Sequence, residues 1–331
     1  MWKKSNLLPQ LSGYSFSFRE RLFDRSAHKM LLFPAAVIQR MDLSGIIPPM
    51  VTPVEDRSGT IAVDELQRLT AHIVDAGVHG VFPCGTTGEF TSFSRAARKE
   101  AVRAVADVAD SVPVLAGCGG TNREEVVAVI EDSNEVGADA AVVVTPFYLP
   151  GSQEGLEDFY TDVADVSPLP IIVYHIPSRT GQELAVETVQ SLAEHPAIVG
   201  IKESTGDMRY LYELVQSTPE SFSVFQGGVI NAPTVLPMGV DGIVPGQANY
   251  MPTSHVEVYD ACMAGDLEGA TTALRRINEI SRPFRDVPLI PAIKYLTSYA
   301  GFDVGPPLPP LSELQTEEKE RLRAKFDEQM E

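Results

Sequence analysis

Cysteine, tryptophan and long apolar runs are scarce in this chain of 331 residues. The three cysteines, Cys84, Cys118 and Cys262, are odd in number and show no CxxC spacing, which indicates neither a disulfide framework nor a zinc site. No stretch approaches the roughly 20 consecutive apolar residues that a membrane helix needs. These absences favour a soluble cytoplasmic protein whose cysteines are reduced and structural.

Basic charge is scarce as well. Eight lysines and eighteen arginines stand against forty-five acidic side chains, and the formal net charge is -19. Nucleic-acid binding requires a basic face that displaces counterions from phosphates, so we do not expect this class of partner. An acidic, lysine-poor composition is instead typical of a protein kept soluble at high salt, and we infer a halophilic source.

The first forty residues differ from the rest. Residues 1–40 hold seven basic side chains against two acidic ones, together with the only tryptophan, Trp2. A basic targeting arm is one interpretation, but no proper apolar segment with a small-residue cleavage site follows Lys3 and Lys4. We therefore expect residues 1–40 to be a disordered or artefactual extension, with the natural start at or near Met41.

Eight short apolar runs follow, rich in Val and Ile and without strict alternation. Such runs are typical of parallel strands that are buried on both faces. No GxGxxG fingerprint follows the first run, which disfavours an open dinucleotide-binding sheet. The runs are residues 45–54, 77–85, 112–119, 138–146, 169–177, 197–204, 221–228 and 240–246.

Amphipathic segments with apolar residues three or four apart separate these runs, for example from Val63 and from Ser94. Eight strands, each followed by a helix, predict a (β/α)8 TIM barrel over residues 41–265. Residues 266–331 exceed what the barrel needs. We expect them to form a C-terminal helical appendage, with helices starting near Asp266, Pro291 and Ser312.

Lys202 is the most informative residue, because it alone among the five lysines after Met41 lies in an apolar strand run, IVGIKES. Burying an ammonium without a partner is costly, so burial favours the neutral amine. A neutral amine can attack a ketone and form an iminium that withdraws electrons from the adjacent carbon. A lysine that reaches the barrel rim or pairs with Glu203 is the structural alternative.

Tyr174, in IIVYHIP, is expected on the neighbouring strand, where its phenol can transfer protons. Taken alone, it is better explained as a core tyrosine with a satisfied hydroxyl. His175 and Cys84 also end apolar runs, but single residues of these types in such runs more often serve packing.

The segment GTTGE, residues 85–89, places two hydroxyls and several backbone N–H groups at a strand-to-helix turn. Unsatisfied N–H groups at such a turn suit a carboxylate. A simple capped turn is the alternative interpretation.

Four motifs occur in order: GTTGE (85–89), VTPFY (144–148), YHIPSRTG (174–181) and GIKES (200–204). Their combination and spacing resemble the dihydrodipicolinate synthase/N-acetylneuraminate lyase family of class I aldolases, from about Gly45 to the C-terminus. The resemblance implies a lyase acting on pyruvate or another 2-oxo acid. It also implies a homodimer or homotetramer, with no metal or organic cofactor.

The resemblance further implies roles for individual residues. Lys202 matches the Schiff-base lysine, Tyr174 the proton-shuttling tyrosine, and Tyr148 a relay tyrosine that reaches across a dimer contact. Thr86 matches a threonine of the proton relay. The residues expected to bind substrate are Thr87, Gly85, Arg179 and Ile243.

The subfamily is less clearly indicated. Arg179 resembles the arginine that holds the aldehyde's carboxylate in dihydrodipicolinate synthases, although it could be a rim residue without substrate contact. Lysine-inhibited synthases usually carry histidines where this chain has Arg95 and Arg98, so lysine feedback is not expected. The last third, with residues 239–252 and 301–310, looks more like archaeal 2-keto-3-deoxygluconate aldolases.

The favoured function is therefore reversible aldol cleavage of 2-keto-3-deoxygluconate, or its 6-phosphate, to pyruvate and glyceraldehyde or its 3-phosphate. The first alternative is 4-hydroxy-tetrahydrodipicolinate synthase, which joins pyruvate and aspartate semialdehyde. A keto-deoxy sugar acid dehydratase is the second alternative. A barrel that binds ligands without catalysis is a remote one, because fold alone does not determine function.

Overall fold

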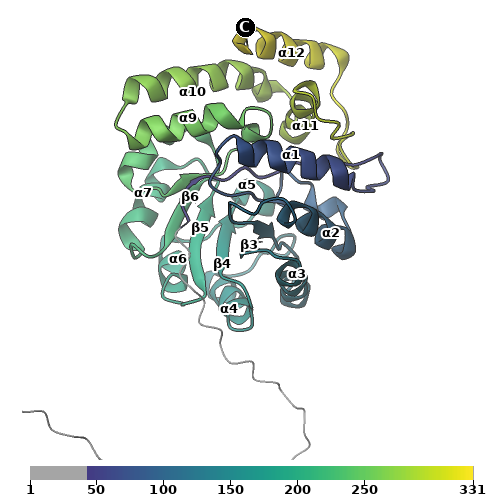
Figure 1. Ribbon diagram of the computed structural model, residues 1–331. Coiled ribbons are helices and arrows are strands. Elements are labelled where there is room, and N and C mark those ends of the chain that lie inside the picture. Colours follow the sequence, from purple (N-terminus) through teal and green to yellow (C-terminus); the bar gives the residue numbers. More distant parts are fainter. Residues whose placement is uncertain (1–42, 331) are drawn as a thin grey trace, which may run out of the picture. The chain divides into compact units, whose positions relative to one another are not determined.

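The structure, a computed structural model, describes residues 43–330. The expected extension over residues 1–40 lies outside the described residues. The described chain forms a curled parallel sheet surrounded by helices (Figure 1). None of the helices described is long and apolar enough to cross a membrane.

Seven parallel strands form the sheet in the order β1-β7-β6-β5-β4-β3-β2. Each strand falls within one of the predicted apolar runs, and nearly all strand residues are buried. The strands are β1 (Gly45–Ile46), β2 (Leu115–Gly117), β3 (Ala140–Val144), β4 (Ile171–His175), β5 (Ile198–Glu203), β6 (Ser223–Gln226) and β7 (Gly242–Ile243).

The remaining predicted run, residues 77–85, joins the two edges of this sheet through isolated bridges. Phe82 pairs with Pro49 beyond β1, and Val81 pairs with Val114 before β2, both in parallel. The run is shorter than a regular strand because Pro83 lacks an N–H and Cys84 adopts a positive φ of 56°.

Alternate residues of the strands face two separate apolar clusters. Val142 and Ile172 belong to an inner cluster enclosed by the sheet, whereas Val143 and Val173 belong to the larger cluster beneath the helices. This arrangement follows from the period of two along a strand, and it explains why the runs are apolar throughout.

Helices follow the strands and cover the outer face of the sheet (Figure 1). Several begin with a side-chain cap: Ser94 accepts from Ala97 N, and Asn122 accepts from Glu125 N. The helices up to the last strand are α1 (Val63–Asp75), η1 (Phe90–Ser92), α2 (Arg95–Ala106), α3 (Arg123–Glu135), α4 (Gln153–Ala164), α5 (Pro177–Thr180), α6 (Val186–Leu192), α7 (Met208–Ser217), η2 (Val229–Asn231), α8 (Ala232–Val235) and η3 (Leu236–Met238).

The chain after β7 is helical. Helix α10 packs on α9, and α12 packs on both α10 and α11 (Figure 1). Helices α10, α11 and α12 begin at Leu267, Leu289 and Thr316, within four residues of the starts predicted near Asp266, Pro291 and Ser312. These last helices are η4 (Gly246–Asn249), α9 (Pro252–Met263), α10 (Leu267–Ser281), η5 (Arg282–Asp286), α11 (Leu289–Tyr299) and α12 (Thr316–Met330).

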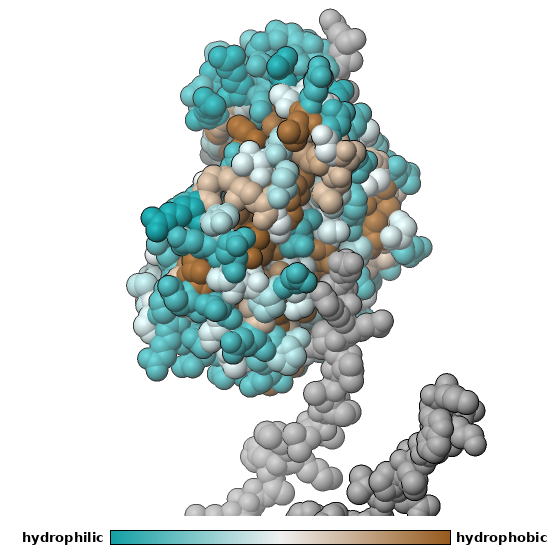
Figure 2. Space-filling view, turned by 90° about the vertical axis from the view of Figure 1, so that its left-hand side faces the viewer, coloured by the Kyte–Doolittle hydropathy of each residue, from teal (hydrophilic) through white to brown (hydrophobic). Residues whose placement is uncertain are grey.

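The surface is largely hydrophilic on the face shown in Figure 2, where apolar residues gather in a band across the middle. Many acidic side chains of the helices pair with a neighbouring base, as Glu65 pairs with Arg68 on α1. Exposed pairs of this kind add little stability, so the core clusters hold the fold together.

Candidate active site

A cavity of about 390 Å³ opens at the carboxyl ends of the strands. This is the edge of the sheet where parallel α/β folds of this type place their reacting groups. Five of the residues predicted from the sequence to act at the site line this cavity: Thr86, Thr87, Tyr174, Arg179 and Lys202.

Lys202 lies on β5 opposite its register partner Tyr174 on β4. Its side chain is buried, and Nζ lies 4.0 Å from the centroid of the Tyr174 ring and 5.0 Å from that of Phe82. Among residues 43–330 no carboxylate forms an ion pair with this amine, so pairing with Glu203 is not found. The amine therefore lines the cavity with no carboxylate in ion-pair contact.

The Tyr174 hydroxyl lies 3.4 Å from Oγ1 of Thr86. Tyr174 is buried, and its ring meets Phe82 edge-to-face. The two hydroxyls come from different elements, β4 and the turn after residue 82, and both reach the cavity. A contact of this kind can pass a proton between the cavity and the turn.

The GTTGE turn presents Thr86 and Thr87 to the cavity. Thr52 donates to the carbonyl of Gly88 at 2.9 Å, and Glu89 N donates to Thr86 O at 3.1 Å. Gly85 does not line the cavity. A Cβ on Gly85 would lie 2.9 Å from the Phe82 ring, so this glycine lets the turn pack closely on the sheet.

Ile243 does not lie where we expected it. It is fully buried in the cluster beneath the helices, and its neighbour Val244 lines the cavity instead. Successive strand residues face opposite sides of a sheet, so an error of one position moves a side chain from the cavity to the core.

Tyr148 does not line the cavity of its own chain. It is 89% exposed and has a positive φ of 80°, which is uncommon for a bulky residue. The structure therefore does not bring Tyr148 together with Lys202 and Tyr174 within one chain. Its role stays a prediction that requires a second copy.

Sequence reasoning missed several polar residues that line the cavity. Ser178 and Ser204 lie just after β4 and β5, and Asn231 and Gln247 lie in the 3-10 turns beyond β6 and β7. Their position after a strand was the available signal, because the residues that follow parallel strands meet at one edge.

His175 and Glu203 are register partners one position beyond Tyr174 and Lys202. His175 Nε2 accepts from Leu184 N at 3.1 Å, while burial lowers the pKa of this imidazole to about 4. Burial also raises the pKa of Glu203, whose carboxylate accepts from Thr205 N. His175 is therefore a neutral packing residue at physiological pH, as single histidines in apolar runs usually are.

The cysteines are buried and free. Burial raises the pKa of both Cys84 and Cys118 to about 12, so neither supplies a thiolate nucleophile. No group of three or more His, Cys, Asp or Glu side chains that could hold a metal occurs among the described residues.

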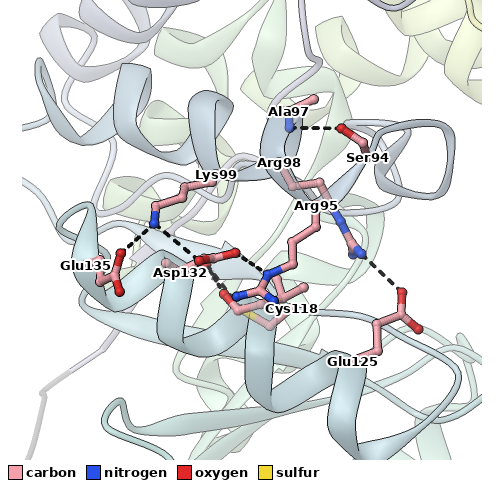
Figure 3. Close-up of polar contacts among 11 residues, drawn as sticks. Ser94, Arg95, Ala97, Arg98, Lys99, Cys118, Glu125, Asp132 and Glu135 are labelled. Atoms are coloured by element: carbon pink, nitrogen blue, oxygen red, sulfur yellow. Dashed lines mark hydrogen bonds and ion pairs between the residues drawn. The ribbon is translucent and has the colours of Figure 1, made fainter.

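Arg95 and Arg98 lie on α2 and contact acids of α3, as Figure 3 shows. Arg98 is buried, donates to the Gly119 carbonyl at 2.7 Å and pairs with Glu125 at 3.2 Å. Arg95 pairs with Asp132. Both arginines therefore link α2 to α3 through ion pairs with acidic side chains.

Comparison with known proteins gives consistent results. The model of the dihydrodipicolinate synthetase family matches residues 42–329. A DapA-like lyase of Halobacterium salinarum, described as uncharacterized, is 37% identical over 86% of this chain and 93% of its own. The 4-hydroxy-tetrahydrodipicolinate synthase of Methanospirillum hungatei is 35% identical over 84% of this chain and 97% of its own.

A solved structure shares the fold. YagE, a prophage protein of the dihydrodipicolinic acid synthase family from E. coli K12, was determined in complex with pyruvate. It matches with a TM-score of 0.83 and 30% identity over 87% of this chain and 99% of its own. With the family model covering nearly all described residues, this chain belongs to the dihydrodipicolinate synthetase family of lyases.

Proposed function

We propose that this protein binds pyruvate or another 2-oxo acid as a Schiff base on Lys202, and needs no metal or organic cofactor. The observation that carries the proposal is the buried Lys202 amine in register with Tyr174, whose hydroxyl lies 3.4 Å from that of Thr86. YagE, described in complex with pyruvate, supports a 2-oxo acid as the ligand.

The favoured reaction is aldol cleavage. The Lys202 amine attacks the C2 ketone, and loss of water gives an iminium. Tyr174 takes the proton of the C4 hydroxyl, and the electrons of the C3–C4 bond move into the iminium, so an aldehyde leaves and an enamine remains. Protonation of C3 and hydrolysis release pyruvate and restore the amine. Thr86 relays the proton, while Thr87 and the backbone N–H groups of the turn hold the carboxylate.

The proposed substrate is 2-keto-3-deoxygluconate or its 6-phosphate. Hydroxyl and amide groups line the cavity around Lys202, from Ser178, Ser204, Asn231 and Gln247. Such groups can donate to and accept from the several hydroxyls of a sugar acid. This lining favours a hydroxylated aldehyde as the second product.

A second candidate is 4-hydroxy-tetrahydrodipicolinate synthase activity. Arg179 lines the cavity, and a planar guanidinium can bind the carboxylate of aspartate semialdehyde through two hydrogen bonds. The name of the Methanospirillum relative supports this alternative.

We also infer that the curled sheet closes as an eight-stranded barrel through Val81 and Phe82.

We further infer that the chain forms a homodimer or homotetramer. The exposed pair Tyr148 and Leu149, at 89% and 76%, supports an interface at the end of β3. Burying these side chains against a second copy removes apolar surface from water.

The test is borohydride reduction with pyruvate, followed by peptide mass analysis. A reduced pyruvyl adduct on Lys202 is the expected result, and absence of an adduct with pyruvate overturns the proposal. Turnover is then followed with 2-keto-3-deoxygluconate, its 6-phosphate, and aspartate semialdehyde plus pyruvate. Release of pyruvate from a keto-deoxy acid supports the aldolase, and consumption of aspartate semialdehyde supports the synthase instead.

A further inference from the structure

The GTTGE turn ends in a buried ion pair with the C-terminal helices. Lys294 Nζ on α11 lies 2.9 Å from a carboxylate oxygen of Glu89, and the two side chains are only 2% and 1% exposed. Glu89 itself has a positive φ of 54°, so the turn adopts a backbone conformation that needs support.

Both partners make further hydrogen bonds to backbone groups. Lys294 donates to the carbonyls of Pro306, at 2.8 Å, and Thr52, at 3.4 Å. The second oxygen of Glu89 accepts from Leu308 N at 2.7 Å. The pair thus joins four segments: the end of the first strand run, the GTTGE turn, helix α11 and the segment after it.

The same helix also contacts the cavity. Ile293, the residue before Lys294, lines the cavity together with Thr87 and Gly246. A Cβ on Gly246 would lie 2.7 Å from Ile293 Cδ1 and 3.5 Å from Thr87 Oγ1, so these three residues meet closely. A shift of α11 relative to the turn would therefore move Ile293, which lines the cavity beside Thr87.

We propose that Glu89 and Lys294 are positioning residues that hold the GTTGE turn in the geometry required to bind the substrate carboxylate. The inference rests on the proposed function, because it assumes that the turn binds a 2-oxo acid. A buried pair adds little net stability, yet removing one partner leaves an uncompensated charge beside the turn. The C-terminal helices then contribute to the site through a contact that touches no substrate.

The experiment compares Glu89→Gln and Lys294→Met with Lys99→Met as the matched control. Lys99 also pairs with two acids, Asp132 and Glu135, between α2 and α3 (Figure 3), and it does not line the cavity. Borohydride trapping on Lys202 is measured against the concentration of pyruvate, and separately of acetone, a ketone without a carboxylate. Lys294→Arg tests rescue by a conservative change.

We expect the pyruvate concentration for half-maximal trapping to rise roughly 10- to 100-fold in Glu89→Gln and Lys294→Met, since small displacements of positioning groups have effects of this size. Acetone trapping should change by less than about 2-fold, and Lys294→Arg should recover part of the loss. Lys99→Met should behave like the wild type with both ketones.

Equal losses with pyruvate and acetone, or unchanged pyruvate trapping in folded variants, would overturn the positioning role. Circular dichroism establishes folding, and Glu89→Gln, which preserves size and shape, decides the question if Lys294→Met does not fold. Loss of folding in both variants would mean that the pair supports the whole fold, and the selective role would be wrong. Absence of any adduct in the wild type would instead refute the proposed function.

Discussion

Tyr174 on β4 and Lys202 on β5 are register partners on adjacent strands, and the Lys202 amine lies 4.0 Å from the centroid of the Tyr174 ring. Backbone register fixes this relationship, because both residues lie within hydrogen-bonded strands. A Schiff base on Lys202 would therefore form beside a proton-transfer group that needs no loop movement to reach it.

Replacing Lys202 by alanine should abolish turnover, because the nucleophile and electron sink are lost together. Activity is measured by pyruvate release, and mass analysis after borohydride should show no adduct. Lys202→Arg is the matched control, since it keeps a long basic side chain at this position, but a guanidinium cannot form an imine at neutral pH. Undiminished turnover in Lys202→Ala would refute the assignment.

Tyr174→Phe should lower kcat by about 100- to 10,000-fold, the range typical of a lost general acid–base group. The ring packing against Phe82 and Lys202 is retained, so the protein should stay folded. Borohydride trapping with pyruvate measures imine formation alone, so that this step can be compared with carbon–carbon cleavage. An unchanged kcat would show that another group moves the proton.

Arg179→Met should distinguish the two candidate reactions. If Arg179 holds the carboxylate of aspartate semialdehyde, loss of the bidentate contact should raise KM for that aldehyde by about 10-fold or more. Under the aldolase proposal, cleavage of 2-keto-3-deoxygluconate should retain most of its kcat. Side-by-side initial rates with both substrates provide the measurement, and equal losses would mean that Arg179 only supports the rim.

Ile243 and Val244 form a matched pair on opposite sides of the sheet. Ile243→Ala should reduce the free energy of unfolding by about 2–5 kcal/mol, as for large buried aliphatic residues, with KM little changed. Val244→Ala should raise KM, because its side chain lines the cavity. Urea denaturation and steady-state kinetics on both variants test the assignment. A raised KM in Ile243→Ala, with an unchanged KM in Val244→Ala, would mean that Ile243 contacts the substrate.

Stability should fall as the pH drops from about 6.5 to about 4. Burial lowers the pKa of His175 and of His255 to about 4, whereas an unfolded histidine titrates near 6.5. The folded state disfavours the protonated imidazole, so its contribution is complete above pH 6.5 and is lost as the pH falls through this window. Each residue contributes about 3 kcal/mol between the two ends.

The measurement is the free energy of unfolding in urea at pH values from 4.5 to 8 (about 0.5 apart). His175→Asn should flatten this dependence by roughly half, because one of the two buried imidazoles is gone. A slope identical to that of the wild type would mean that the pKa of His175 does not differ between the folded and unfolded states, and the prediction would be wrong.

Much of the arrangement could be predicted from the sequence, because buried parallel strands leave continuous apolar runs. Lys202 stood out as a charge inside such a run, and Tyr174 followed from its place in the preceding run. Thr86, Thr87 and Arg179 were placed through motif resemblance, and all three line the cavity.

Other features could not be predicted, because they depend on side-chain direction and on distant contacts. Whether Ile243 or Val244 faces the cavity depends on one residue of register, which amino-acid composition does not determine. The pair of Glu89 and Lys294 joins positions 205 residues apart. Lys294 lay in a segment that read simply as helix, and no local signal marked its partner.

The scarcity of lysine has a consequence for chemical durability. Aldehydes glycate accessible amines without any enzyme, and the proposed reaction releases an aldehyde. Of the five lysines in residues 43–330, Lys202 and Lys294 are buried. The amines of the other three, Lys99, Lys319 and Lys325, each contact a carboxylate. Few amines in this part of the chain are therefore free to react with the aldehyde product. We expect glycation to inactivate the protein only slowly during prolonged turnover.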